Sequence, residues 1–206
     1  MLFTEYNFLD RFSAAAGHGF KGVEILFPYE WSANEIRYAL NENSLKQVLL
    51  NTPPGDLASG DRGLGAIPGR ESDFFSSLQL ALEFAGTLMC ERIHVMAGVI
   101  EEEKEMQEAR RTFVENLKRA AVVAEKYGVD LLIEPINNKR DIPGYFLSRI
   151  SDARKIIEEI GKENVGLQLD LYHAQIMDGD LETLIRDNID ITRHYQIAGV
   201  PARHEP

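Results

Sequence analysis

The chain has 206 residues, of which 44% are hydrophobic and 27% are charged, as in an ordinary soluble globular protein with one core. Its formal net charge is -11, and this argues against nucleic acid and anionic membrane surfaces as partners, because both attract basic surfaces. The single cysteine cannot form an internal disulfide, and no opening apolar run resembles a signal peptide or a membrane span. We therefore expect one domain, residues 1–206, in the cytoplasm.

Short runs rich in strand-forming residues alternate with helical patterns along the chain. A first helix is expected in "EYNFLDRFSAAAGHG", where Phe8, Phe12 and Ala15 share one face. The predicted strands cover residues 22–28, 45–51, 92–98, 129–137, 165–173 and 193–199. The further predicted helices cover residues 32–43, 71–86, 102–127, 147–160 and 180–188. This alternation predicts parallel strands joined by right-handed crossovers.

The helix predicted over 102–127 has the strongest periodicity. Its apolar residues recur at helical spacing with charged residues on the other face, and Gly128 follows as a helix stop. The apolar residues are Phe113, Leu117, Ala120, Ala121 and Ala124. Such a helix is expected to pack against the outside of a sheet.

Polar residues at the ends of the predicted strands favour one of two architectures. A doubly wound sheet and a (β/α)8 TIM barrel both satisfy the alternation, but barrels collect their site residues from the carboxyl ends of several strands. The polar residues in such positions are Glu24, Asn51, Glu134, Asp170, His173 and Gln196. The glycines of "AGHGFKG" precede a strand, whereas a dinucleotide-binding turn follows one. We therefore predict a TIM barrel.

Three of these residues suggest a metal site. Glu134, Asp170 and Gln196 come from three successive strands and offer oxygen ligands, which suit Mg²⁺ or Mn²⁺ better than Zn²⁺. His173 could ligate, donate to substrate or support a ligand. Each carboxylate taken alone could instead cap a helix or pair with an arginine. His94 lies within a predicted strand and is expected to be structural.

Several longer motifs carry a resemblance to a known family. They are "FPYEW", "NTPPGDLASGDRGLGAIPGRE", "IEPINN", "LQLDLYHAQIMDGDL" and "QIAGVPARHEP". Together they resemble the hydroxypyruvate isomerase family, within the xylose-isomerase-like barrels, over nearly the whole chain. The resemblance implies a TIM barrel enzyme that interconverts hydroxypyruvate and tartronate semialdehyde, or related short 2-oxo acids, with a divalent metal at the barrel mouth.

The resemblance also implies roles for individual residues. Glu134 would be a metal ligand and a catalytic acid/base group, while Asp170 and Gln196 would be further ligands. His173 and Arg203 resemble positions that contact substrate. The proposed chemistry removes a proton from the carbinol carbon and passes through an enediolate.

An anionic substrate needs a cationic partner, and the Gly-rich loop from Pro53 to Arg70 offers two arginines. Arg62 and Arg70 are candidate substrate-binding residues, and Arg70 is favoured because it leads into a predicted helix whose N-terminus could assist. The alternative is that both pair with Asp56, Asp61 or Glu71 at the surface.

The resemblance is incomplete at both ends. The family's first strand and its eighth strand, which supplies a second glutamate and a fourth ligand, have no counterpart in these residues, so the predicted strands correspond to strands two to seven. Two other functions stay open: a ketose 3-epimerase-like sugar isomerase and a catalytically inactive sugar-acid-binding fragment. Zinc-dependent DNA repair barrels are disfavoured because their several histidine ligands and basic face are absent. Association into a homo-oligomer stays open.

Overall fold

The computed structural model describes residues 2–204 and contains one sheet of six parallel strands. In spatial and chain order the strands are β1 (Gly22–Ile25), β2 (Lys46–Asn51), β3 (Arg92–His94), β4 (Asp130–Ile133), β5 (Val165–Asp170) and β6 (Thr192–Gln196). The α-helices are α1 (Asp10–Gly17), α2 (Ala33–Glu42), α3 (Glu71–Leu88), α4 (Met106–Glu125), α5 (Ile150–Ile160), α6 (Leu171–Met177) and α7 (Leu181–Asn188). Two 3-10 turns are η1 (Leu57–Ser59) and η2 (Glu103–Glu105).

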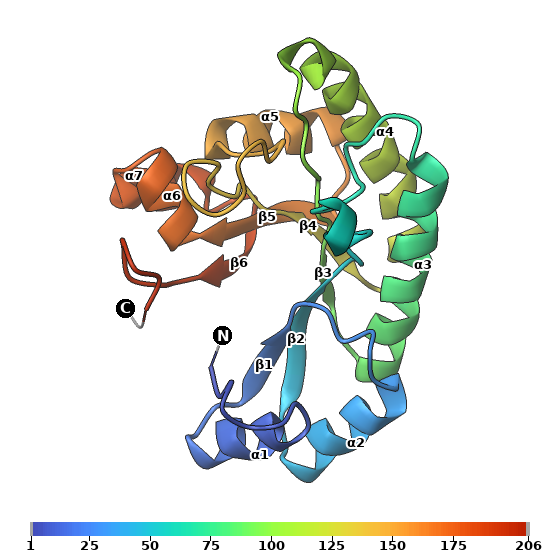
Figure 1. The fold of residues 1–206 in the computed structure, drawn as a ribbon, viewed down its shortest axis with the longest axis vertical. Helices are drawn as coiled ribbons and strands as arrows, with labels where there is room; N and C mark the ends of the chain where they lie inside the picture. The colour runs from blue at the N-terminus through green and yellow to red at the C-terminus, as the bar shows by residue number, and fades with distance from the viewer. Residues whose placement is uncertain (1, 205–206) are drawn as a thin grey trace.

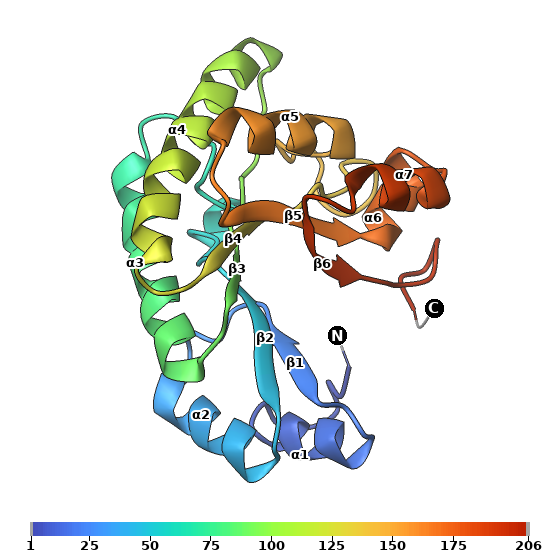
Figure 2. The same ribbon diagram turned by 180° about the vertical axis from the view of Figure 1, so that it is seen from behind.

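The sheet curves into an arc, with helices α2 to α5 on its outer side (Figures 1 and 2). The result is a half-barrel, in agreement with the predicted TIM barrel architecture, while the numbering of its strands as two to seven stays a prediction. Side chains at the two edges meet: on β6, Gln196 donates a hydrogen bond to Glu24 of β1 over 2.6 Å. Within residues 2–204, none of the helices has the length and apolar character that a membrane crossing requires.

The main core lies between the sheet and the outer helices. The apolar faces of α3 and α4 are fully buried there, as their sequence periodicity predicts. Representative core residues are Leu50, Phe74, Leu82, Ile93, Phe113, Leu117 and Ile133. Burial of large aromatic and aliphatic side chains on this scale stabilises the curved sheet and holds the strand ends in place.

The inner face of the sheet is polar toward the carboxyl ends of the strands. Paired residues of parallel strands project to the same face, and the register pairs Asn51 with His94 and Asp170 with Gln196. These side chains and Glu134 therefore gather at one end of the half-barrel. Buried polar groups need partners, so this end is a candidate for a functional site.

Five of the six observed strands are shorter than predicted at their carboxyl ends, while β2 ends at Asn51 as predicted. The prediction of strand over 165–173 was wrong beyond Asp170, because Asp170 caps α6 by accepting a hydrogen bond from the Tyr172 backbone N–H at 2.8 Å. The predicted helix over 102–127 begins as a 3-10 turn and ends at Glu125. Gly128 follows with φ +66°, and its N–H donates to the carbonyl of Glu125.

Candidate metal and substrate site

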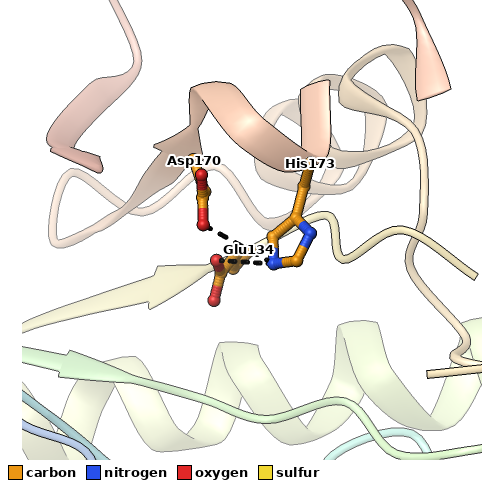
Figure 3. A group of neighbouring side chains, drawn as sticks. All are labelled: Glu134, Asp170 and His173. Atoms are coloured by element: carbon orange, nitrogen blue, oxygen red, sulfur yellow. Dashed lines mark ion pairs between the residues drawn. The ribbon is translucent and has the colours of Figure 1, made fainter. Parts of the chain in front are cut away.

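Three buried side chains converge at the carboxyl ends of β4 and β5 (Figure 3). Glu134 follows β4, Asp170 ends β5 and His173 lies on the first turn of α6. One potential ligand atom from each lies within 4.8 Å of the other two. His173 Nε2 is 3.5 Å from Asp170 Oδ2 and 3.8 Å from Glu134 Oε1. The structure thus brings together three of the residues selected from the sequence.

Glu134 is in an unusual electrostatic environment. Its side chain is 7% exposed, and burial raises its pKa well above the ordinary value, with the Asp170 carboxylate adding to the rise. The Arg203 guanidinium acts in the opposite direction. A buried carboxyl group with a raised pKa can both accept and return a proton, as acid/base catalysis requires.

The loop after β4 contacts the imidazole ring of His173 through Asn137. Asn137 Nδ2 lies 2.7 Å from His173 Nδ1, and both side chains are almost completely buried. The pKa of His173 is lowered below its ordinary value, mainly by burial, and the neighbouring carboxylates of Asp170 and Asp141 offset part of that fall. The ring therefore presents its Nε2 edge to Glu134 and Asp170.

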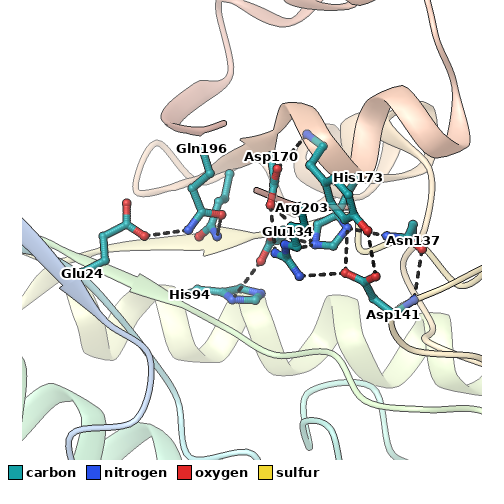
Figure 4. Close-up of polar contacts among 11 residues, drawn as sticks. Glu24, His94, Glu134, Asn137, Asp141, Asp170, His173, Gln196 and Arg203 are labelled. Atoms are coloured by element: carbon teal, nitrogen blue, oxygen red, sulfur yellow. Dashed lines mark hydrogen bonds and ion pairs between the residues drawn. The ribbon is translucent and has the colours of Figure 1, made fainter. Parts of the chain in front are cut away.

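Arg203 reaches the same place from the segment after β6 (Figure 4). Its Nη2 lies 3.2 Å from Asp170 Oδ2, and its Nη1 donates to Asp141 Oδ2 at 2.7 Å. The guanidinium lies over the Tyr172 ring, 4.9 Å from its centroid. Its φ is +56°. The structure therefore places a cation beside the carboxylate and imidazole group.

Gln196 lies on β6, where it is paired in register with Asp170 of β5. Its amide oxygen accepts a hydrogen bond from Gln168 Nε2 at 2.8 Å, and its amide nitrogen donates to Glu24. To bind a metal through Oε1, the Gln196 amide would have to exchange its partner. Its role as a ligand stays a prediction.

The two loop arginines are occupied elsewhere. Arg70 pairs with Asp61 at 2.8 Å and with Asp73 at 3.0 Å. Arg62 donates to the backbone carbonyls of Leu57 and Asp61. The Arg70–Asp61 pair corresponds to the surface pairing that the sequence left open as the alternative, whereas Arg62 contacts carbonyl oxygens and not a carboxylate. A substrate-binding role for either arginine stays a prediction.

Reasoning from the sequence missed three polar residues at the site. His94, expected to be structural, has its Nδ1 3.4 Å from Glu134 Oε2, and burial lowers its pKa to about 3. Neither ring nitrogen has a hydrogen-bond partner among residues 2–204. Asn137 and Asp141 lie in the loop after β4 and were not selected. The strand predicted over 92–98 placed His94 in mid-strand, whereas β3 ends at His94, which is paired with Asn51 in register.

The donor set fits a divalent cation. Two buried carboxylates that face one another repel, and a cation between them would remove that repulsion. Carboxylate oxygens are preferred by Mg²⁺ and Mn²⁺, and imidazole nitrogen is accepted by several transition metals. The group of Glu134, Asp170 and His173 could therefore hold a divalent metal.

Comparisons with known proteins identify close relatives of this chain. The chain is 51% identical, over its full length and 79% of the relative, to a 2-oxo-tetronate isomerase of Cupriavidus necator. It is 41% identical, over its full length and 80% of the relative, to the hydroxypyruvate isomerase of Escherichia coli. These relatives confirm the resemblance predicted from the motifs.

Solved structures show the same fold. A crystal structure titled AP endonuclease, family 2, from Brucella melitensis matches with a TM-score of 0.96 and 46% identity, over 99% of this chain and 78% of that one. A D-psicose 3-epimerase from Clostridium cellulolyticum matches with a TM-score of 0.79 at 19% identity, over 97% and 71%. The sequence profile of the xylose isomerase-like TIM barrels matches residues 12–206. The chain belongs to the xylose isomerase-like TIM barrel family.

Proposed function

We propose that this chain is a metal-dependent isomerase of short 2-oxo and hydroxy acids, which interconverts hydroxypyruvate and tartronate semialdehyde, or a related acid such as 2-oxo-tetronate, through an enediolate. The observation that carries the proposal is the buried group of Glu134, Asp170 and His173, with Arg203 beside it. The names of the relatives at 51% and 41% identity support the same reaction class.

Glu134 is the proposed acid/base residue. Its carboxylate takes the proton from the carbinol carbon, the C–H electron pair becomes the double bond of the enediolate, and the carbonyl oxygen gains negative charge. The proton then returns to the former carbonyl carbon, while the carbinol hydroxyl gives its proton to the former carbonyl oxygen and its O–H electron pair forms the new carbonyl. Because burial raises the pKa of Glu134, its carboxylate is a stronger base than an exposed one and can hold the proton between the two steps.

The carboxylates of Glu134 and Asp170 would hold Mg²⁺ or Mn²⁺, with Gln196 a further proposed ligand. When bound, the cation would stabilise the negative charge of the enediolate oxygens. Arg203 is the proposed partner of the substrate carboxylate, because it places a positive charge beside the buried group, with Nη2 3.2 Å from Asp170 Oδ2. Asp141 and the Tyr172 ring hold that guanidinium in place.

The direct test is Glu134→Gln, which keeps the shape of the side chain and removes its base. Turnover of hydroxypyruvate and of 2-oxo-tetronate should fall by about 10²–10⁴-fold, and so should deuterium incorporation into recovered substrate in D₂O. Retention of near-full turnover would remove Glu134 from the mechanism. Exchange without a preference for either acid would confine the proposal to the reaction class.

The same assay separates the alternatives that the sequence left open. A ketose 3-epimerase would exchange the C3 proton of a neutral ketose such as D-fructose, whereas an inactive sugar-acid binder would exchange none. We expect exchange with the carboxylated substrates only, since Arg203 supplies the positive charge that a neutral ketose does not need.

A further inference from the structure

Glu24 of β1 reaches across the inside of the half-barrel to β6. These strands are the two ends of the strand order, and within residues 2–204 no backbone pairing joins them. His194 and Gln196, two positions apart on the inner face of β6, both contact the Glu24 carboxylate. Its Oε1 lies 2.5 Å from His194 Nε2, and its Oε2 accepts a hydrogen bond from Gln196 Nε2 at 2.6 Å. Both oxygens of this carboxylate are therefore occupied by β6.

The Glu24 carboxylate determines which way the Gln196 amide faces. An ionised carboxylate only accepts hydrogen bonds, so the Gln196 atom that faces it is the amide nitrogen. Gln196 Oε1 then faces β5, where it accepts a hydrogen bond from Gln168 Nε2 at 2.8 Å. The reversed Gln196 amide would place two acceptors together at Glu24 and two donors together at Gln168. Only one orientation of this amide fits both neighbours.

Gln168 links this contact to the buried carboxylates. It lies on β5, two residues before Asp170, and is almost completely buried. Besides its bond to Gln196, the Gln168 amide donates a hydrogen bond to Glu134. Figure 4 shows Gln196 between Glu24 and the side chains of Glu134 and Asp170. The amide oxygen of Gln196 is thus on the side of the two buried carboxylates, and its nitrogen is on the side of Glu24.

We propose that Glu24 is a positioning residue that holds the Gln196 amide with its oxygen toward Glu134 and Asp170, so that Gln196 can bind a divalent cation there. The inference rests on the proposed function for the role of Gln196 as a ligand. On binding, Oε1 would exchange Gln168 for the cation, whereas the amide nitrogen would keep Glu24 as its partner. Glu24 itself is not a ligand, because His194 and Gln196 occupy its oxygens.

Metal affinity tests this role without substrate. The EPR signal of free Mn²⁺ in a titration of the protein gives the Kd for Mn²⁺. Glu24→Leu removes both acceptors and frees the Gln196 amide to rotate, so Kd should rise by about 10–100-fold, as for other partners that orient a metal ligand. The matched control is Glu30→Leu, which removes the same charge from an exposed residue in the loop after β1. In 0.15 M salt it should change Kd by less than about twofold.

A double-mutant cycle separates orientation of the ligand from a merely structural effect. In a Gln196→Ala background no amide remains to be oriented, so adding Glu24→Leu should change the Kd for Mn²⁺ by less than about twofold. If Glu24 acted only through its charge or by joining β1 to β6, the same addition would weaken binding equally with and without Gln196. Should Glu24→Leu fail to fold, the exchanged pair Glu24→Gln with Gln196→Glu decides. It keeps the net charge and reverses donor and acceptor, and it should bind Mn²⁺ at least as tightly as the wild type, whereas loss of binding would overturn the inference.

The outcomes separate this inference from the proposed function. An unchanged Kd in Gln196→Ala would show that Gln196 is not a ligand, and that part of the proposed function would fail together with the inference. If Gln196→Ala weakens Mn²⁺ binding and Glu24→Leu does not, or if the two effects add in the double variant, the inference alone is overturned. Proton exchange from hydroxypyruvate is measured separately. Mn²⁺ binding that follows the expected cycle in a protein without exchange would defeat the proposed reaction and support the inference.

Discussion

Removing the charge of Glu134 should stabilise the metal-free protein while it removes activity. Two unit charges 4.8 Å apart, the limit of separation in the site, repel by roughly 3.5 kcal/mol at an effective dielectric constant of 20. Arg203 offsets part of this repulsion. We therefore expect Glu134→Gln in EDTA at pH 8 to raise the free energy of unfolding by about 1–3 kcal/mol, which corresponds to about 2–4 °C in Tm for each kcal/mol.

The effect should depend on pH in a defined direction. A carboxyl group whose folded pKa is raised stabilises the fold fully below its unfolded pKa, about 4.3, and that stability is lost as pH rises through the folded pKa. The difference in free energy of unfolding between Glu134→Gln and wild type should therefore shrink as pH falls from 8 to 5. Urea unfolding of both proteins at pH 5 and pH 8 measures this.

Metal should reverse the order of stability. With Mn²⁺ at pH 8 the wild type should gain stability by mass action, whereas Glu134→Gln, with one ligand weakened, should gain less. If Glu134→Gln in EDTA were no more stable than wild type at pH 8, or showed the same gain at both pH values, burial and the Asp170 carboxylate would not raise the pKa of Glu134 as described.

Three further outcomes are expected. Arg203→Ala should raise KM for hydroxypyruvate by about 10–100-fold, which corresponds to the loss of a charged hydrogen bond. Arg70→Ala should change KM by less than about fivefold, because Arg70 is already paired at the surface. A larger rise in KM for Arg70→Ala than for Arg203→Ala in steady-state kinetics would indicate that Arg70, and not Arg203, binds the substrate carboxylate. Below pH 6.5 the free energy of unfolding should fall by up to about 1.4 kcal/mol per pH unit through His94, because its pKa of about 3 in the folded state keeps it neutral; an equally steep fall in His94→Gln would refute this. Gly63→Ala should lower the free energy of unfolding by more than about 1 kcal/mol, since φ at Gly63 is +124° and the new Cβ would lie 2.5 Å from a backbone carbonyl. Gly86→Ala, at a helical site open to solvent, should raise the free energy of unfolding. Urea unfolding measures both variants.

The architecture and the strand-end residues of the candidate site could be predicted from the sequence, because both depend on local pattern. Alternating strand and helix periodicity is sufficient to predict a parallel sheet, and Phe113 and Leu117 at helical spacing predicted which face of α4 is buried. Glu134 and Asp170 were found because each ends an apolar strand, and the ends of parallel strands lie at the same edge of the sheet. Such signals extend over only a few residues.

The rest depended on contacts between residues far apart in the chain. Asn137 and His173 are 36 positions apart, and Arg203 and Asp141 are 62 apart, so no local pattern predicts that they meet. The partners of Arg70 likewise follow from how the Gly-rich loop folds back, which depends on close backbone approaches such as that at Gly63. The sequence by itself therefore determined which polar residues lie at the strand ends. Only the tertiary structure decided which donors and acceptors face one another, because hydrogen bonds depend on distances of a few tenths of an ångström that packing alone sets.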